Sequence, residues 1–125
     1  MAISVLLIDD DPEFRAWAAH MLTDMELSVV AEADSVEAAI RAARKLRPQS
    51  ALVDVGLPDG DGVTLAATLA ALPWRPRIVL TSTDPDAMTD AGAQSVGAAA
   101  FIAKHDLPDS ALPALLSGHA EQEYG

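Results

Sequence analysis

The chain has 125 residues, half of them hydrophobic, and this length suits one compact domain. Its net charge of −11 argues against direct contact of this domain with nucleic acid, because an acidic surface repels the phosphate backbone. The absence of cysteine excludes a disulfide framework and a thiolate metal site.

An apolar run from Ile3 to Ile8 predicts the first strand, which delivers Asp9, Asp10 and Asp11 to the following loop. The run is too short to span a membrane, and it lacks the basic leader of a signal peptide. We therefore expect a cytoplasmic location without membrane contact.

Helix and strand then alternate. Asp11 and Pro12 are typical of a helix start. The amphipathic stripe of this first helix consists of Phe14, Trp17, Ala18, Met21, Leu22 and Met25. A short strand is predicted over 27–31, and a second helix runs from its cap at Ser35 to a stop at Pro48.

The third predicted strand ends at Asp54 and opens into the turn-rich segment 56–62. A third helix follows over about 65–72, and the fourth strand ends at Thr81. A fourth helix is predicted to begin where Asp84 and Pro85 repeat the cap-plus-proline pattern. Its apolar face is thin, so we expect it to be the least firmly held helix.

The fifth strand, predicted over 98–103, delivers Lys104. Because proline is tolerated only in the first turn of a helix, two prolines shift the regular part of the last helix to about 111–118. The expected domain therefore spans 1–118, and a polar tail is predicted over 119–125.

Five alternations of strand and helix are typical of a parallel sheet covered on both faces. We predict an α/β, flavodoxin-like (βα)5 three-layer sandwich, with a five-stranded parallel sheet in the order 2-1-3-4-5. This order puts the first and third strands side by side, and so it brings Asp9 and Asp10 next to Asp54.

The predicted sheet gathers carboxylates, one hydroxyl and one ammonium at the edge where open α/β sheets bind ligands. Two carboxylates about 4 Å apart repel each other by roughly 4 kcal/mol at an effective dielectric constant near 20. Mg²⁺ with oxygen ligands relieves this repulsion, and Lys104 is a second counter-charge. Together these groups resemble the parts needed for phosphoryl transfer to an aspartate.

Each of these features has an ordinary alternative when it is taken alone. The aspartates that follow the first strand are common helix caps, and a threonine hydroxyl such as that of Thr81 most often bonds to backbone. Phe101, in the last strand, is more often a core residue than a moving part. Their coincidence at one edge favours the functional interpretation.

Four segments carry a resemblance to a known family, and they are Leu6–Pro12, Leu52–Gly62, Ile78–Ser82 and Ala100–Lys104. In this order and spacing they resemble the receiver domain of a two-component response regulator, the CheY-like fold. The resemblance runs from Ser4 to about Leu116, and the local wording is most similar to NarL/LuxR-type regulators.

The resemblance implies a role for each matching residue. Asp54 is implied as the phosphoacceptor, and Mg²⁺ is held by Asp9, Asp10, Asp54 and the backbone carbonyl of Gly56. The phosphoryl group is contacted by Thr81 and Lys104, while Phe101 moves with the threonine in switching. The two positions that tune the lifetime of the phosphoryl group are Gly56 and Thr83.

The expected function is a phosphorylation-dependent switch that catalyses only its own phosphorylation and dephosphorylation. Its expected partners are a sensor histidine kinase or phosphotransfer protein and an output partner or effector domain. The output is expected to use the face of the fourth helix, fifth strand and fifth helix. The chain is either a stand-alone receiver or the front of a longer regulator, and a homodimer formed on phosphorylation is a further candidate.

Two rival functions stay open. A small haloacid-dehalogenase-like phosphatase also uses an aspartate nucleophile in an Asp-x-Asp pattern, but it needs a longer chain and an acidic pair after the fourth strand. A degenerate receiver would dock partners without phosphorylation, against which the intact acidic, threonine and lysine positions argue.

Overall fold

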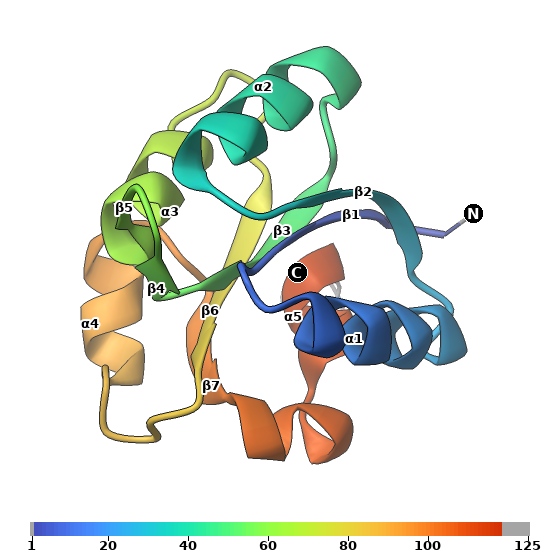
Figure 1. Cartoon of the computed structure of the whole chain (residues 1–125), viewed down its shortest axis with the longest axis vertical. Helices are drawn as coiled ribbons and strands as arrows, with labels where there is room; N and C mark the ends of the chain where they lie inside the picture. The colour runs from blue at the N-terminus through green and yellow to red at the C-terminus, as the bar shows by residue number, and fades with distance from the viewer. Residues whose placement is uncertain (1, 119–125) are drawn as a thin grey trace.

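The computed structural model describes residues 2–118, and its main sheet has the predicted strand order (Figure 1). Across the sheet the strands are β2 (Ser28–Ala33), β1 (Ser4–Ile8), β3 (Ser50–Asp54), β6 (Arg77–Ser82) and β7 (Ala100–Ala103). All neighbouring strands are parallel. The flavodoxin-like order 2-1-3-4-5 is therefore confirmed, with β6 and β7 as the fourth and fifth strands.

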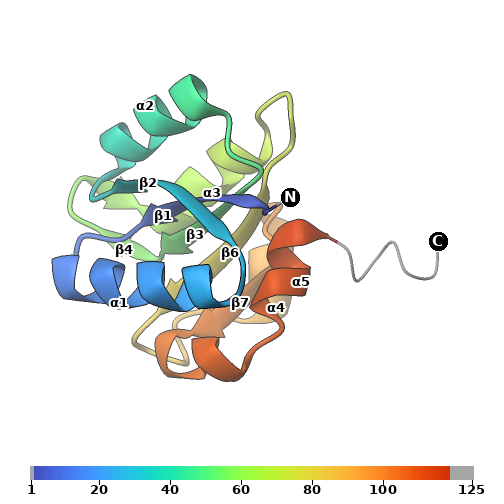
Figure 2. The ribbon, with the colours of Figure 1, turned by 90° about the vertical axis from the view of Figure 1, so that its right-hand side faces the viewer.

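Helices cover both faces of the sheet, which gives three layers (Figure 2). One face carries α1 (Pro12–Asp24), α5 (Leu112–Ser117) and the 3-10 helix η1 (Lys104–Asp109). The other face carries α2 (Val36–Leu46), α3 (Gly62–Ala70) and α4 (Asp90–Ser95). The expected output face of the fourth helix, fifth strand and fifth helix corresponds to α4, β7 and α5.

β1 shows why a continuous apolar run becomes a central strand. Val5 and Leu7 belong to the hydrophobic cluster under α1 and α5. Leu6 and Ile8 belong to the cluster under α2, α3 and α4. All four side chains are at most 1% exposed, so alternation along the strand feeds both cores at once.

Local capping fixes where the helices of the acidic loops begin. Asp11 accepts a hydrogen bond from the backbone N–H of Glu13 (3.0 Å) at the start of α1, as predicted. Ser35 caps α2 through the N–H of Ala38 (3.1 Å). The predicted starts of these two helices are confirmed.

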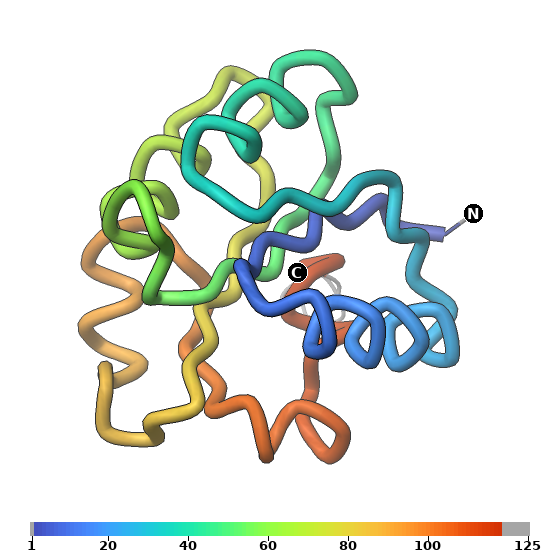
Figure 3. The backbone as a smooth tube through the Cα atoms, in the orientation of Figure 1, coloured from blue at the N-terminus to red at the C-terminus, as the bar shows by residue number. Residues whose placement is uncertain are grey.

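The start predicted for the fourth helix is wrong. Asp84 accepts a hydrogen bond from the N–H of Asp86 (2.9 Å), which closes a turn at Asp84 and Pro85 instead of a helix. The helix α4 begins later, where Thr89 caps it through the N–H of Gly92 (3.0 Å). Figure 3 shows the long connection from β6 to α4 as a wide bend of the chain.

The last helix agrees with the prediction, because α5 lies within 111–118 and ends at Gly118 in a left-handed conformation. The proline-containing segment before it forms η1. A short antiparallel hairpin of β4 (Gly56–Leu57) and β5 (Gly60–Asp61), which the sequence patterns do not predict, follows β3. The predicted tail 119–125 lies outside the described residues, and the domain boundary at 118 stays a prediction.

Within residues 2–118, no helix combines the length and the apolar character that a membrane crossing requires. In this described part of the chain the longest helix is α1, with 13 residues. A transmembrane helix needs about 20 consecutive, mostly apolar residues.

Candidate phosphoryl-acceptor site

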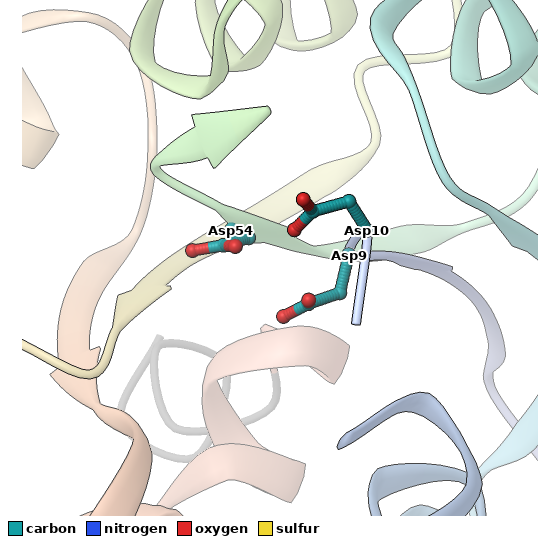
Figure 4. Close-up of side chains that lie close together, drawn as sticks. All are labelled: Asp9, Asp10 and Asp54. Atoms are coloured by element: carbon teal, nitrogen blue, oxygen red, sulfur yellow. The ribbon is translucent and has the colours of Figure 1, made fainter. Parts of the chain in front are cut away.

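Three carboxyl groups meet at the carboxyl edge of the sheet (Figure 4). Asp9 follows β1 and Asp54 ends β3, and these two strands are hydrogen-bonded neighbours. One oxygen from each of Asp9, Asp10 and Asp54 lies within 4.8 Å of the others. Asp9 is fully buried, Asp54 is 9% exposed, and Asp10 faces solvent. The predicted convergence of these aspartates is therefore present.

Lys104 supplies the positive charge of the cluster. Its Nζ lies 2.7 Å from Oδ2 of Asp9 and 3.9 Å from Oδ2 of Asp54. The first contact is an ion pair without hydrogen-bond geometry, so Oδ2 of Asp9 is a buried oxygen that accepts no hydrogen bond. This buried oxygen is therefore offset by the charge of the Lys104 ammonium and not by a directed hydrogen bond.

The pKa of Asp54 is raised to about 6, mainly because burial disfavours the charged carboxylate. The negative charge of Asp9 adds to the rise. The ammonium of Lys104 and the N–H of Gly56 act in the opposite direction, and the latter donates to Oδ1 of Asp54 over 3.4 Å. The carboxylate is thus a base with a raised proton affinity that is still mostly ionised at neutral pH.

Thr81 lies next to the cluster, but its hydroxyl points elsewhere. Thr81 pairs with Asp54 in the register of β3 and β6 and is only 1% exposed. Its Oγ1 donates a hydrogen bond to the carbonyl oxygen of Ile102 in β7 (2.6 Å). The ordinary alternative of a hydroxyl bonded to backbone therefore holds in this state.

The remaining predicted residues lie around this edge. Phe101 is half-buried against the α2–α4 core, and its backbone N–H donates to Oδ1 of Asp90 in α4 (3.0 Å). Thr83 is exposed after β6, and Gly56 is exposed in β4. A Cβ built at Gly56 meets no heavy atom within 4 Å, so this position has room for a side chain.

The loop after β3 is fixed to its surroundings at two points. Asp59 accepts hydrogen bonds from the N–H groups of Val36 (2.8 Å) and Glu37 (3.2 Å) at the start of α2. The bond from Val36 is the main cause that lowers the pKa of Asp59. At Gly62, a Cβ would lie 2.8 Å from Cα of Val55 and collide with the backbone of Asp54, so only glycine fits.

Two neighbours of the cluster come from the first turn of α1. The Nζ of Lys104 lies 4.0 Å from the ring centroid of Phe14, which sequence reasoning counted only as a member of the apolar stripe. Arg15 donates through its guanidinium to the carbonyl oxygen of Asp9 (2.6 Å) and pairs with Glu32 (3.3 Å). The sequence feature that could have identified both residues is their place in the first helical turn after the acidic loop.

The sheet order and the residues at its carboxyl edge put the chain in the class of flavodoxin-like α/β domains. The family described as the response regulator receiver domain matches residues 5–115, and the chain belongs to this family. The predicted fold class and the predicted family are both confirmed. The same match sets aside the haloacid-dehalogenase-like alternative.

Relatives and solved structures agree with this assignment. The chain is 38% identical over 105 residues to the DNA-binding transcriptional activator DevR/DosR of Mycobacterium tuberculosis, covering 82% of this chain and 48% of that protein. It is similar to the signal receiver domain of the putative response regulator NarL from Mycobacterium tuberculosis, with a TM-score of 0.76, 28% identity, and coverage of 99% and 98%. For the BeF3-activated N-terminal receiver domain of Klebsiella pneumoniae RstA, the TM-score is 0.72 at 27% identity, with coverage of 95% and 96%. The chain spans about half the length of the curated relatives it matches.

Proposed function

We propose that Asp54 accepts a phosphoryl group from the phosphohistidine of a sensor histidine kinase or phosphotransfer protein. The observation that carries this proposal is the meeting of the Asp54 carboxylate with the Lys104 ammonium, 3.9 Å away, and with the carboxylates of Asp9 and Asp10. At neutral pH most of the Asp54 carboxylate is ionised and can act as a nucleophile, given a pKa of about 6.

Mg²⁺ fits the donor set of this site. The residues that would hold it are Asp9, Asp10 and Asp54 together with the backbone carbonyl of Gly56. The buried Oδ2 of Asp9, which accepts no hydrogen bond, supports this assignment, as does the mutual closeness of the three carboxylates. When bound, the ion supplies positive charge that neutralises the carboxylates and the phosphoryl oxygens.

The chemistry asked of the chain's own residues is small. One carboxylate oxygen of Asp54 forms a bond to phosphorus, the phosphorus–nitrogen bond breaks, and the histidine nitrogen keeps its electron pair. Lys104 stabilises the negative charge of the transferred group. Thr81 reaches that group only by giving up its bond to the carbonyl oxygen of Ile102.

The output is proposed to use the surface of α4, β7 and α5. The bond between Phe101 and Asp90 supports this choice, because it joins β7 to the start of α4. An output partner, an effector domain beyond this sequence and a homodimer formed on phosphorylation are the candidate users of this surface. Relatives about twice as long favour an effector domain. A cytoplasmic location and the absence of direct nucleic-acid contact stay predictions.

Phosphorylation with acetyl phosphate and Mg²⁺ tests the proposal. The wild type should gain one phosphoryl group by intact-protein mass spectrometry, and Asp54→Asn should gain none. Asp86→Asn, an exposed carboxylate beyond β6, serves as the matched control and should label normally. Substantial labelling of Asp54→Asn would assign the nucleophile to another residue.

The same samples separate a receiver that is phosphorylated from one that only docks partners, and they check the expected lack of phosphatase activity. We expect almost no turnover of p-nitrophenyl phosphate, because the chain's own chemistry is limited to its phosphorylation and dephosphorylation. A receiver that only docks partners would show neither labelling nor shifts in NMR spectra with beryllofluoride and Mg²⁺. Substantial turnover of p-nitrophenyl phosphate by the wild type would contradict the phosphoacceptor role. So would the absence of both labelling and NMR shifts.

Gly56 and Thr83 are proposed to leave the phosphoryl group weakly shielded from water. The open space at Gly56 makes this testable, because a longer side chain fits there without collision. Gly56→Gln should lengthen the lifetime of the phosphorylated state, measured by loss of label after removal of the donor. An unchanged lifetime would argue against shielding at this position.

A further inference from the structure

The ammonium of Lys104 has two kinds of neighbour. Asp9 and Asp54 attract it through their negative charge, at 2.7 and 3.9 Å. The ring of Phe14 lies under it at 4.0 Å from the centroid. With the lysine side chain 13% exposed, the contact with the ring is largely shielded from water, which strengthens a cation–π interaction.

These two kinds of neighbour respond differently when the site is loaded. A divalent cation claims the same carboxylate oxygens that now attract Lys104, and it repels the ammonium. The ring of Phe14 carries no net charge and is not a ligand for a metal ion or a phosphoryl group. It is therefore the one contact of this set that stays available to Lys104 in every state of the site.

The position of the ring is well defined. Phe14 lies in the first turn of α1, which Asp11 caps and Pro12 pre-organises. Its ring packs against Trp17 with centroids 5.7 Å apart and belongs to the cluster around α1 and α5. The platform for the ammonium is thus a rigid element and not a loop.

We propose that Phe14 is a positioning residue for phosphoryl recognition, whose ring holds the Lys104 ammonium beside Asp54. This inference rests on the proposed function and names a residue that acts through Lys104. It predicts that loss of the ring weakens binding of a phosphoryl group but not of Mg²⁺. Mg²⁺ contacts only oxygen atoms, whereas a phosphoryl group also needs the ammonium.

The test compares Phe14→Leu, which keeps the apolar bulk, with Phe14→Tyr, which keeps the aromatic face. Beryllofluoride at saturating Mg²⁺ serves as the phosphoryl probe, and Mg²⁺ alone is titrated separately, both followed by NMR. Phe14→Leu should weaken beryllofluoride binding by about three- to tenfold. The Mg²⁺ affinity should change by less than about twofold, and Phe14→Tyr should bind both ligands as the wild type does.

Met25→Leu is the matched control, since Met25 packs against the same cluster at the other end of α1 from Phe14. It should leave both affinities unchanged. Equal beryllofluoride affinity in Phe14→Leu and the wild type would overturn the role of Phe14. So would a parallel loss of both affinities, which indicates a general structural defect. A wild type that binds no beryllofluoride would overturn the proposed function itself, and this inference with it.

Fluorination of the ring tests the same contact without removing its apolar bulk. Phenylalanine with one, two or three ring fluorines at position 14 keeps the shape of the ring while it weakens the negative ring face. Beryllofluoride affinity should fall stepwise with fluorination at constant Mg²⁺ affinity. A flat series would contradict the cation–π contact.

Discussion

The two halves of the molecule differ in the length and the capping of their helices. In the first half, α1 and α2 have 13 and 11 residues, and both begin with a side-chain cap. In the second half, α4 and α5 have six residues each, and α5 has no side-chain cap. The three aspartates come from the first half, whereas Thr81 and Lys104, the residues expected to respond to phosphorylation, come from the second.

The difference suggests a division of labour. A site for a small, highly charged group needs ligands held by rigid elements, because misplacement weakens every electrostatic contact. A switch needs an element whose two arrangements differ little in free energy, and short helices with few buried side chains suit that task. Matched substitutions in the two halves test this difference.

The largest effects are expected from cavities in the core. Leu22 of α1 and Leu116 of α5 are both at most 1% exposed and belong to the same cluster. Leu22→Ala should lower the free energy of unfolding by about 3–5 kcal/mol, and Leu116→Ala by about 2–3 kcal/mol, because the six-residue helix α5 relaxes more easily into the cavity. Urea unfolding measures both values. Equal losses would contradict the difference between the halves.

Ionisation of Asp54 should be visible in the stability of the metal-free protein. Because the pKa rises to about 6 in the folded state from 3.8, the folded carboxyl holds its proton more tightly than the unfolded one. Stability linked to this group is therefore fully present below the unfolded pKa and lost as pH rises through the folded pKa. Asp54→Asn should be more stable than the wild type by about 1–3 kcal/mol near pH 8, and by little near pH 4.

Unfolding in EDTA at the two pH values checks this expectation, with the exposed Asp24→Asn as control. Added Mg²⁺ should reverse the order, since a ligand that binds the folded wild type stabilises it. A difference that does not depend on pH would show that burial of the Asp54 charge is not its cause.

A smaller effect is expected at the contact between α4 and β7. Asp90→Ala removes the acceptor of the Phe101 N–H and should cost about 1 kcal/mol. Amide exchange at Phe101 should accelerate while exchange in β1 stays unchanged. Asp86→Ala is the control, because Asp86 is an exposed aspartate of the same connection whose carboxylate accepts no hydrogen bond among residues 2–118. Equal exchange rates in both variants would show that the hydrogen bond to Asp90 does not hold β7 against α4.

The smallest effect is expected in the well-built half itself. Glu37 and Arg41 form an ion pair on α2 over 3.1 Å, with both side chains more than 70% exposed. Arg41→Ala should change the free energy of unfolding by less than about 0.5 kcal/mol. A larger loss would mean that surface charge, and not the buried core, sets the two halves apart.

Much of the fold was open to prediction because its signals are local. Apolar runs such as 3–8 and turn residues after Asp54 mark the strands, and the parallel order then brings Asp9 and Lys104 to one edge. The start of α4 was not predictable from the Asp84–Pro85 pattern, since the same residue types begin both turns and helices. Whether these residues form a turn or begin a helix depends on the packing of residues further along the chain.

The details of the site were harder to predict. The apolar stripe of α1 identifies Phe14 as buried, but it does not say which distant side chain lies over the ring. Similarly, the strand pattern puts Thr81 at the right edge, whereas the direction of its hydroxyl depends on the nearby carbonyl of Ile102. Such contacts join residues far apart in the chain, so no local pattern encodes them.

Gly62 limits how sequences descended from this one can diverge. No side chain fits between this residue and the backbone of Asp54, whatever the carboxylate does. Descendants that abandon phosphorylation are free to replace Asp54, yet the glycine eight positions on must persist as long as the fold does. It should therefore outlast the chemistry, as a mark of descent in chains that no longer signal.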